Sequence, residues 1–335
     1  MLKIGVLGAG HLGKIHIKCI KQIDRYELVG FYDPDAATAK AVEEELGVHC
    51  FASIEALIEA VEVVDIVTPT VQHFECASKA LQRRRHVFIE KPIVATPDEA
   101  SQLMKLADEA GVKVQVGHVE RFNPAFIAAE PFIKAPKFVE AHRLALFNPR
   151  GTDVPVVLDL MVHDLDILFT IINSPVSRVS ACGVAIVSPT PDITNSRIEF
   201  ENGSVANLTA SRISLKNMRK TRIFQNDAYI TVDFLDKKTE ITRIHDHEVQ
   251  GYPYSLTLDL ANGTSRQITL ERPEIHPLNA IQTELESFYD SIIHNTVPVV
   301  SIQDGVRVLN LAYDIIRAAE ERNEEFGMRN SECGV

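Results

Sequence analysis

The sequence predicts an α/β protein in which an N-terminal doubly wound parallel sheet precedes a C-terminal α+β domain with an open, mostly antiparallel sheet. In the first third of the chain, strand and helix signals alternate, and such alternation requires crossovers that place helices on both faces of a parallel sheet. After residue 120, one helical pattern is followed by a long series of strand signals. We therefore expect two domains, residues 1–120 and 121–335.

The elements of the first domain follow from apolar runs that end at turn residues. The expected strands are 3–7, 27–32, 63–68, 86–90 and 113–117. The expected helices are 13–22, 36–46, 54–60, 74–84 and 97–110. The segment 63–67 is almost wholly apolar, which is typical of a strand that helices cover on both faces.

The second domain contains more strand signals than helical ones. The expected helices are 156–172, 277–294 and 302–325. The expected strands are 176–187, 193–200, 204–211, 220–225, 228–234, 254–260 and 265–270. Turn triplets such as Glu201-Asn202-Gly203 separate the strands, which indicates antiparallel hairpins.

Composition argues against several classes of function. A net charge of −12 disfavours binding to nucleic acid or to anionic membranes, although it allows a local cationic pocket. No apolar stretch approaches the roughly twenty residues that span a bilayer, and the early first strand leaves no room for a signal peptide. The five scattered cysteines predict free thiols in a cytoplasmic protein. We expect no metal site, and we assign His245-Asp246-His247 to a loop.

The most informative motif is Gly-x-Gly-x-x-Gly, which directly follows the first strand. Gly8 permits a tight turn, Gly10 leaves room for phosphates near the backbone, and Gly13 lets the next helix pack closely. The positive end of that helix would then face a pyrophosphate. The residues expected to contact a dinucleotide here are Gly8, Gly10, His11, Leu12 and Gly13.

Asp33 ends the second strand, where an acid binds the adenosine ribose hydroxyls. A carboxylate at this place favours NAD over NADP because it repels a 2′-phosphate; the alternative is a simple turn residue before Pro34. Thr68, Pro69 and His73 follow the apolar run 63–67 and are expected to line the ribose and nicotinamide. The alternative for these three is a plain turn with threonine caps.

Glu90-Lys91-Pro92 ends another strand of the same sheet. Ligands bind beyond the carboxyl ends of strands in open α/β sheets, so Glu90 and Lys91 are expected beside the nicotinamide. The alternative is an exposed lysine before a rigid proline. On the helix expected at 156–172, Asp159, His163 and Asp166 have the spacing i, i+4, i+7 and form a narrow polar stripe. This stripe either contributes to a site or faces bulk water.

Together, the glycine motif, Glu90-Lys91-Pro92 and the Asp159 and His163 pair resemble the glucose–fructose oxidoreductase / inositol dehydrogenase / MocA family. The resemblance covers nearly the whole chain. It implies a Rossmann domain followed by an open sheet, on which family members often build homodimers or homotetramers. It also implies that Lys91, Asp159 and His163 line the active site and contact the substrate.

Three further stretches resemble a subgroup that oxidises UDP-N-acetylglucosamine at the sugar 3-position for amino-sugar and lipopolysaccharide synthesis. They are residues 117–124, 148–153 and 211–220. Arg121, Asn123 and Arg150 are the candidate substrate ligands from these stretches. The second domain is also rich in cations, which a diphosphate requires: Arg121, Arg150, Arg212, Lys216, Arg219, Lys220 and Arg222. The alternative is a solvated face of the sheet, favoured for Lys216, Arg219 and Lys220 and open for Arg121 and Arg150.

The expected reaction is oxidation of a secondary alcohol on a sugar ring. His163 is the first candidate for the acid/base, with Asp159 orienting its ring and Lys91 stabilising the developing alkoxide. A lysine with a lowered pKa is the alternative base. Three other functions stay open: oxidation of a free polyol or sugar such as inositol, non-catalytic NAD sensing, and biliverdin-type reduction. The last two make no use of the three polar residues.

Overall fold

The computed structural model describes residues 1–148, 154–261 and 263–325, and these residues form two compact units. The first unit comprises Met1–Val119 with Asn279–Asn310. The second comprises Glu120–Leu278 with the described part of Leu311–Val335. The segment Asn279–Asn310 thus belongs to the first unit although the second unit separates it from the rest of that unit in sequence.

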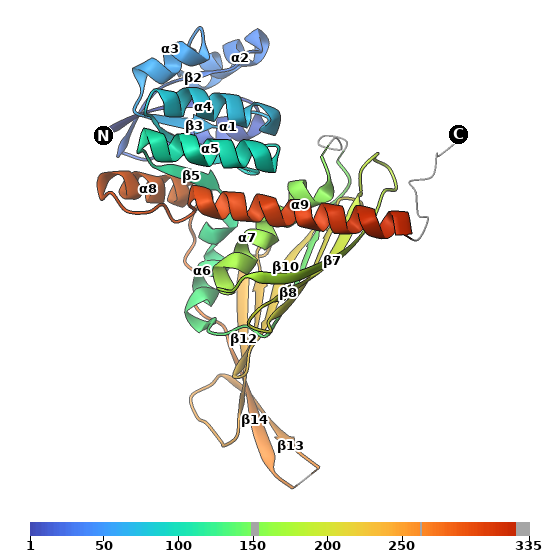
Figure 1. The fold of residues 1–335 in the computed structure, drawn as a ribbon. Helices are drawn as coiled ribbons and strands as arrows, with labels where there is room; N and C mark the ends of the chain where they lie inside the picture. The colour runs from blue at the N-terminus through green and yellow to red at the C-terminus, as the bar shows by residue number, and fades with distance from the viewer. Residues whose placement is uncertain (149–153, 262, 326–335) are drawn as a thin grey trace. The chain divides into compact units, whose positions relative to one another are not determined.

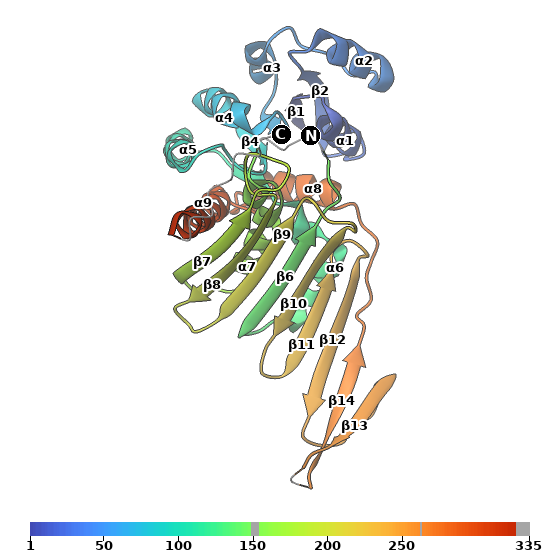
Figure 2. The same cartoon turned by 90° about the vertical axis from the view of Figure 1, so that its right-hand side faces the viewer.

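The first unit is built on a parallel sheet, as the sequence predicts (Figures 1 and 2). Its strands are β1 (Leu2–Leu7), β2 (Tyr26–Tyr32), β3 (Val63–Ile66), β4 (His86–Glu90) and β5 (Val114–Gly117). Their order in the sheet is β2-β1-β3-β4-β5, and every pairing is parallel. The order reverses direction at β1, and open α/β sheets bind ligands beyond the carboxyl ends of strands at such a point.

The helices of the first unit differ in how they begin. They are α1 (His11–Ile20), α2 (Ala36–Leu46), α3 (Ile54–Ala60), η1 (Thr70–Gln72), α4 (His73–Gln82), α5 (Pro97–Ala110) and α8 (Ala280–Ile293). Side chains of Asp35, Ser53 and Thr96 cap α2, α3 and α5, which satisfies N–H groups that a helix start leaves free. At α1 the N-cap is Gly10, with no side-chain cap.

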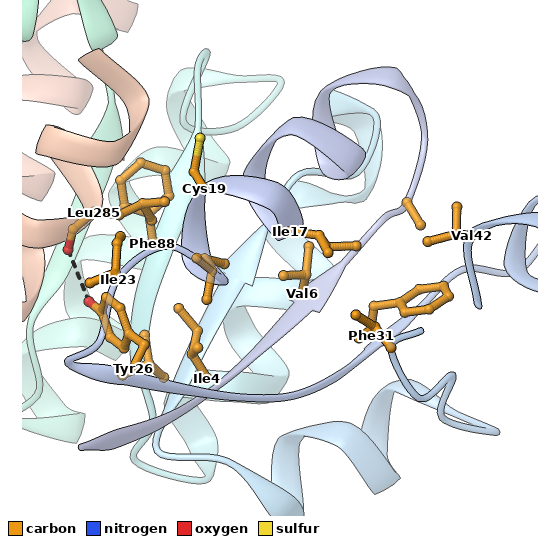
Figure 3. Packing of buried hydrophobic residues seen from close by; sticks show 14 of the residues in the cluster. Ile4, Val6, Ile17, Cys19, Ile23, Tyr26, Phe31, Val42, Phe88 and Leu285 are labelled. Carbon is orange, nitrogen blue, oxygen red and sulfur yellow. Dashed lines mark hydrogen bonds between the residues drawn. The ribbon is translucent and has the colours of Figure 1, made fainter. Parts of the chain in front are cut away.

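The core of the first unit lies between β1, β2 and the helices α1 and α8 (Figure 3). Ile4, Ile17 and Phe31 are fully buried there. Leu285 and Phe288 of α8 join them with no exposed surface, and the Tyr26 hydroxyl donates a hydrogen bond to the Leu285 carbonyl at 3.1 Å. These contacts explain why α8 belongs to this unit.

The second unit is built on a larger sheet, in the order β13-β14-β12-β11-β10-β6-β9-β8-β7 (Figure 2). The strands are β6 (Phe138–Leu144), β7 (Val176–Val184), β8 (Ile193–Phe200), β9 (Val205–Ser211), β10 (Met218–Phe224), β11 (Ala228–Asp233), β12 (Lys238–His245), β13 (Tyr254–Asp259) and β14 (Ser265–Glu271). Among the described pairings, β6 with β9 is parallel and the others are antiparallel. The expectation of a mostly antiparallel sheet is confirmed.

Two strands of this sheet were not expected from the sequence. Buried and half-buried positions alternate along β6, but the buried set includes the charged Arg143, which hides the apolar alternation. In β12, the buried Thr239 and Ile241 alternate with the charged Lys238 and Glu240, and Thr239 is itself polar. The loop assignment of 245–247 was wrong for His245, which is the last residue of β12, and is confirmed for Asp246 and His247, which follow the strand.

The second unit contains several short helical elements and the end of one long helix. They are η2 (Val119–Phe122), α6 (Pro124–Ala129), η3 (Glu130–Phe132), the π-helical turn η4 (Val157–Met161) and α7 (Val162–Ile171). The long helix α9 (Ile302–Glu325) begins in the first unit and ends in the second. No described helix is both long and apolar enough to cross a bilayer.

Candidate active site

The glycine turn after β1 has the geometry that its three glycines predict. Gly8 has a φ of +93°, and a Cβ there would lie 2.7 Å from the Val67 carbonyl oxygen. A Cβ on Gly13 would lie 2.0 Å from the Gly8 carbonyl oxygen, so no larger residue fits. A Cβ on Gly10 would meet nothing within 4 Å. Open space therefore adjoins the uncapped N-terminus of α1, where a side chain would obstruct a phosphate.

His11 and Leu12 follow Gly10 on the outer surface of the turn. Both are exposed, Leu12 to 37%. Exposure leaves their backbone and side chains accessible to a ligand at the helix N-terminus. Their contact with a dinucleotide stays a prediction.

Asp33 is held against the glycine turn by main-chain donors. The Ala9 N–H donates to Asp33 Oδ2 at 2.8 Å, and the Asp35 N–H donates to Asp33 Oδ1 at 2.9 Å. The carboxylate is therefore fixed at the carboxyl end of β2, where the sequence places the ribose.

A pocket of about 170 Å³ adjoins this end of the sheet. It is lined by Leu7, Tyr32, Pro34, Ile54, Thr68, Gln72, Glu75 and Cys76. Burial raises the pKa of the Cys76 thiol to about 11, so the thiol is neutral at physiological pH. The lining combines apolar walls with a few polar groups, which suits a flat organic ring.

His73 joins the segments that follow β3 and β4. Its ring is buried, with Nδ1 2.9 Å from the Pro92 carbonyl oxygen and Nε2 2.8 Å from that of Thr68. Burial lowers the pKa of His73. Thr68 is half-buried and Pro69 exposed, and neither η1 nor α4 has a side-chain cap. The alternative of a threonine-capped turn was wrong, and His73 has a supporting position rather than an exposed one.

Lys91 lies just beyond β4 and is anchored through its main chain. Glu90 is 8% exposed, and its Oε2 accepts a hydrogen bond from the Lys91 N–H at 3.1 Å. The Lys91–Pro92 peptide is cis, and the Lys91 side chain is half-buried. A Cβ on Gly117 would lie 2.8 Å from Glu90 Oε1, so the neighbouring strand β5 has room for the carboxylate only because it carries glycine.

Two buried groups that were not expected from the sequence form a chain of contacts that ends at Glu90. His16 of α1 and Asp65 of β3 are both fully buried. His16 Nδ1 lies 2.9 Å from Asp65 Oδ2, and His16 Nε2 lies 3.2 Å from Glu90 Oε1. The signal in the sequence was Asp65 itself, a lone charge inside an otherwise apolar strand.

In the second unit, Asp159 and His163 lie on the half-exposed side of the segment formed by η4 and α7. Both are half-buried, whereas Leu158, Met161 and Val162 around them are buried. The segment begins with a π-helical turn, a feature frequent at functional sites. The helical segment expected at 156–172 is confirmed, with a π-helical turn near its start.

Asp166 does not lie on the half-exposed surface that Asp159 and His163 share. It is fully buried, and Arg121 binds it bidentately: Nε lies 2.9 Å from Oδ2 and Nη2 lies 2.6 Å from Oδ1. Asp164 on the same helix is bound by Arg143 of β6. Both acids of α7 thus hold the helix to its own unit, which fixes the position of His163.

The candidate substrate ligands Arg121 and Asn123 are engaged within the second unit. Asn123 Nδ2 donates to Glu120 and to the Phe234 carbonyl, while Asn123 Oδ1 accepts from the Ala125 N–H at the start of α6. Arg121 forms the pair with Asp166 described above. Arg150 lies outside the described residues.

Most of the other cations of the second domain have partners in the sheet. Lys220 pairs with Asp233 and Arg222 with Glu140. Arg219 lies 3.8 Å from Glu120, and the buried Arg212 donates to the Val154 carbonyl. Lys216 is exposed. The contacts of Arg219 and Lys220 and the exposure of Lys216 agree with the solvated face that the sequence favours for these three residues.

The sequence-predicted site residues are divided between the two units. The glycine turn, Asp33, Thr68, His73, Glu90 and Lys91 lie in the first unit, whereas Asp159 and His163 lie in the second. Among the described residues, no three His, Cys, Asp or Glu side chains gather as a metal site would require.

The parallel sheet, its switch point at β1 and the glycine turn define the first unit as a Rossmann domain. Residues 2–118 match the family described as "Oxidoreductase family, NAD-binding Rossmann fold". Residues 145–231 match the GFO/IDH/MocA C-terminal domain. The chain belongs to the Gfo/Idh/MocA family, and it is an oxidoreductase.

The chain is similar over most of its length to named dehydrogenases. It is 36% identical over 310 residues to UDP-N-acetylglucosamine 3-dehydrogenase from Acidithiobacillus ferrooxidans, covering 92% of this chain and 97% of that one. A solved structure of that enzyme has a TM-score of 0.86 at 34% identity and covers 96% of this chain and 98% of its own.

Inositol dehydrogenases are less similar. The inositol 2-dehydrogenase of Rhizobium meliloti is 25% identical over 341 residues, covering 96% of this chain and 98% of that one. The structure of scyllo-inositol dehydrogenase from Lactobacillus casei has a TM-score of 0.76 at 20% identity, covering 96% and 98% of the two chains, and shows the fold alone.

Proposed function

We propose that this protein uses NAD to oxidise the 3-hydroxyl of UDP-N-acetylglucosamine, or of a closely related UDP-sugar, to a ketone. The observation that carries the proposal is the likeness over 92% of the chain to a UDP-N-acetylglucosamine 3-dehydrogenase. The polar groups of both units support it, because alcohol oxidation requires an acid/base and a group that stabilises an alkoxide. The alternative substrate is a free polyol such as inositol, and the inositol dehydrogenases are less similar to this chain.

The first unit has the features that NAD requires. The uncapped start of α1 beside Gly10 would hold the pyrophosphate, and the fixed carboxylate of Asp33 would accept the ribose hydroxyls. The same carboxylate supports NAD over NADP, because its orientation by Ala9 and Asp35 keeps negative charge where a 2′-phosphate would bind. The pocket beyond β1 and β2 would take the adenine. When bound, NAD accepts the hydride from the sugar carbon.

Three side chains would manage the proton and the developing charge. We assign removal of the hydroxyl proton to His163, because an imidazole titrates near neutral pH. Asp159, half-buried on the same surface, would orient the ring and stabilise the imidazolium. The ammonium of Lys91 would hydrogen-bond the substrate oxygen while it becomes an alkoxide and then a carbonyl. Lys91 as the base is the competing assignment.

We assign supporting roles to Arg121 and Asn123. The pair of Arg121 with Asp166 holds α7, and Asn123 caps α6. They would therefore shape the surface that receives the sugar rather than bind its diphosphate directly.

The deciding experiment is a mass-spectrometric product assay. The protein is incubated with UDP-N-acetylglucosamine and NAD, with and without 2-oxoglutarate to recycle tightly held cofactor, and an amine trap captures the ketone. The expected product is lighter than the substrate by two hydrogen atoms. Lys91→Met and His163→Ala should abolish it, whereas the exposed-site controls Lys105→Met and His276→Ala should not. Turnover of inositol, with no reaction of any UDP-sugar, would overturn the substrate assignment.

We further propose that the chain forms a homo-oligomer through its large sheet. β13 is an edge strand, and every one of its residues is exposed. Tyr254, Leu256 and Leu258 are 57%, 49% and 37% exposed. An exposed apolar edge strand is prone to pair with another chain. Figures 1 and 2 show the β13–β14 hairpin extending past the ends of the other strands of its sheet. Light scattering should give a multiple of the chain mass, reduced by Leu256→Lys; a monomeric wild type would contradict the proposal.

A further inference from the structure

Three titratable side chains meet inside the first unit, beneath the glycine turn. His16 comes from α1, Asp65 from β3 and Glu90 from the end of β4. His16 and Asp65 have no exposed surface, and Glu90 is 8% exposed. The imidazole lies between the two carboxylates, with Nδ1 2.9 Å from Asp65 and Nε2 3.2 Å from Glu90.

This geometry constrains the charge of the imidazole. A neutral ring has one N–H, so it satisfies one carboxylate and turns a lone pair toward the other. An imidazolium has a proton on each nitrogen, so it can hydrogen-bond Asp65 and form an ion pair with Glu90. Contacts between ionised groups are the stronger ones. Buried carboxylates need such partners because burying an unpaired charge costs on the order of several kcal/mol.

The charges around His16 favour its protonated form, although burial also raises the pKa of Asp65 against the opposing effect of His16. Although burial acts to lower it, Asp65 and Glu90 raise the pKa of His16 well above its usual value. The pKa of the Glu90 carboxyl is lowered, because His16 and Lys91 outweigh the effect of burial. Four other titratable groups lie close to the cluster. Lys91 and His73 interact with Glu90, and burial lowers the pKa of His73. Burial raises the pKa of Cys19 and of Tyr26, so both are neutral.

The cluster connects two parts of the proposed cofactor and substrate site. His16 belongs to the helix whose N-terminus follows Gly10, while Glu90 accepts a hydrogen bond from the Lys91 N–H. Because residue 117 is glycine, the Glu90 carboxylate fits against β5, and a Cβ at that position would collide with it. The His16 imidazole therefore connects the helix that follows the glycine turn to the carboxylate that binds the Lys91 main chain.

We propose that His16 is a positioning residue: its doubly paired imidazolium holds the Glu90 carboxylate, which in turn fixes the main chain of Lys91. His16 touches neither substrate nor cofactor in this role. The claim about its charge stands on the first unit alone, whereas the claim about catalysis rests on the proposed function of Lys91.

The charge is tested first, without substrate, by NMR of the full chain labelled with ¹⁵N in its histidine rings. His16, assigned by the signal lost in His16→Gln, should show two protonated ring nitrogens at pH 7.5. His86 is the control, since its Nδ1 accepts a hydrogen bond from the Lys113 N–H and burial lowers its pKa, so it should show one protonated nitrogen. In Glu90→Gln, His16 should become neutral at a lower pH. A neutral His16 in the wild type would overturn the inference.

Positioning is tested by kinetics with whichever sugar the protein oxidises. His16→Gln should lower kcat by about tenfold or more, as loss of an orienting partner does at other sites, with the KM for NAD changed less than kcat. His86→Gln, at the opposite end of β4, is the matched control and should keep its kcat. An unchanged kcat in a folded His16→Gln would refute positioning, and failure of UDP-sugars alone would refute the substrate assignment while the NMR result stood.

Discussion

The two units of this protein each bury a cation between two carboxylates, and the two cations differ in kind. In the first unit His16 lies between Asp65 and Glu90. In the second, Arg143 donates to Asp164 at 2.9 and 3.0 Å and to Glu120 at 2.9 Å. A guanidinium keeps its charge at every physiological pH, whereas an imidazolium can lose its proton.

The difference indicates which part of the molecule responds to pH. Although burial acts to lower it, Asp164 and Glu120 raise the pKa of Arg143, so the support of α7 is permanent. The support of Lys91 rests on a group that can lose its proton. The same arrangement of charges is thus a fixed structural element in one unit and a titratable one in the other.

The largest predicted change in the free energy of unfolding comes from removing Arg143, the buried cation of the second unit. Arg143→Met removes the cation that binds both buried acids, so Asp164 loses its ion-pair partner and Glu120 keeps only the more distant Arg219. Loss of one partner from a buried ion pair costs about 3–5 kcal/mol. Urea unfolding followed by circular dichroism measures the change. Arg197→Met, which removes an exposed pair with Glu199, should cost at most about 1 kcal/mol. Equal losses in the two variants would contradict the importance of burial.

A second prediction separates the roles of the two units in catalysis. His163→Ala should lower kcat by about a hundredfold or more, the usual contribution of an acid/base. NAD affinity should be retained, because the glycine turn and Asp33 lie in the first unit. Steady-state kinetics and NADH fluorescence titration measure the two quantities. Near-normal kcat would refute the role of His163, and lost NAD binding would show that the variant perturbs more than proton transfer.

A third prediction compares two buried histidines of the first unit. The pKa of His16 is raised in the folded state, so its contribution to stability is complete below about pH 6.5 and is lost as pH rises through the folded pKa. The pKa of His73 is lowered, so its contribution is present above that pH and is lost as pH falls.

The unfolding free energies of wild type, His16→Gln and His73→Asn, measured by urea titration between pH 5 and pH 9, test these signs. The difference between wild type and His16→Gln should shrink toward high pH, and that for His73→Asn should shrink toward low pH. Each slope is limited to about 1.4 kcal/mol per pH unit. Slopes of the same sign would contradict the assigned charges.

Local patterns predicted much of this fold, because the information lay in neighbouring residues. The strands of the first unit appear as apolar runs since helices cover both faces of the sheet. The glycine turn is likewise a local motif, and its sterics match the expectation. β6 was missed because Arg143 occupies a buried position, and only the distant Asp164 and Glu120 make that position tolerable.

The supporting groups of the candidate site were harder to predict for the same reason. Arg121 was a candidate substrate ligand because of the resemblance of residues 117–124 and its charge, yet its partner Asp166 is 45 residues away in sequence. His16 and Asp65 are 49 residues apart, and neither suggests the other without the sheet order that brings α1 and β3 together. A sequence shows the sign of a charge but not which opposite charge folding places beside it.

The smallest predicted effect extends the comparison to an exposed cluster. Lys14 and Lys18 of α1 bind the exposed Glu45 of α2 at 2.8 and 3.0 Å. Hydrogen bonds and charge from these lysines lower the pKa of Glu45 to about 2. A carboxyl ¹³C NMR titration should give that midpoint in the wild type and a higher one in Lys14→Met. Glu45→Gln should leave the melting temperature nearly unchanged, because water screens an exposed pair and competes for its donors. A large loss of stability in Glu45→Gln would mean that exposure does not distinguish this cluster from the buried ones around His16 and Arg143.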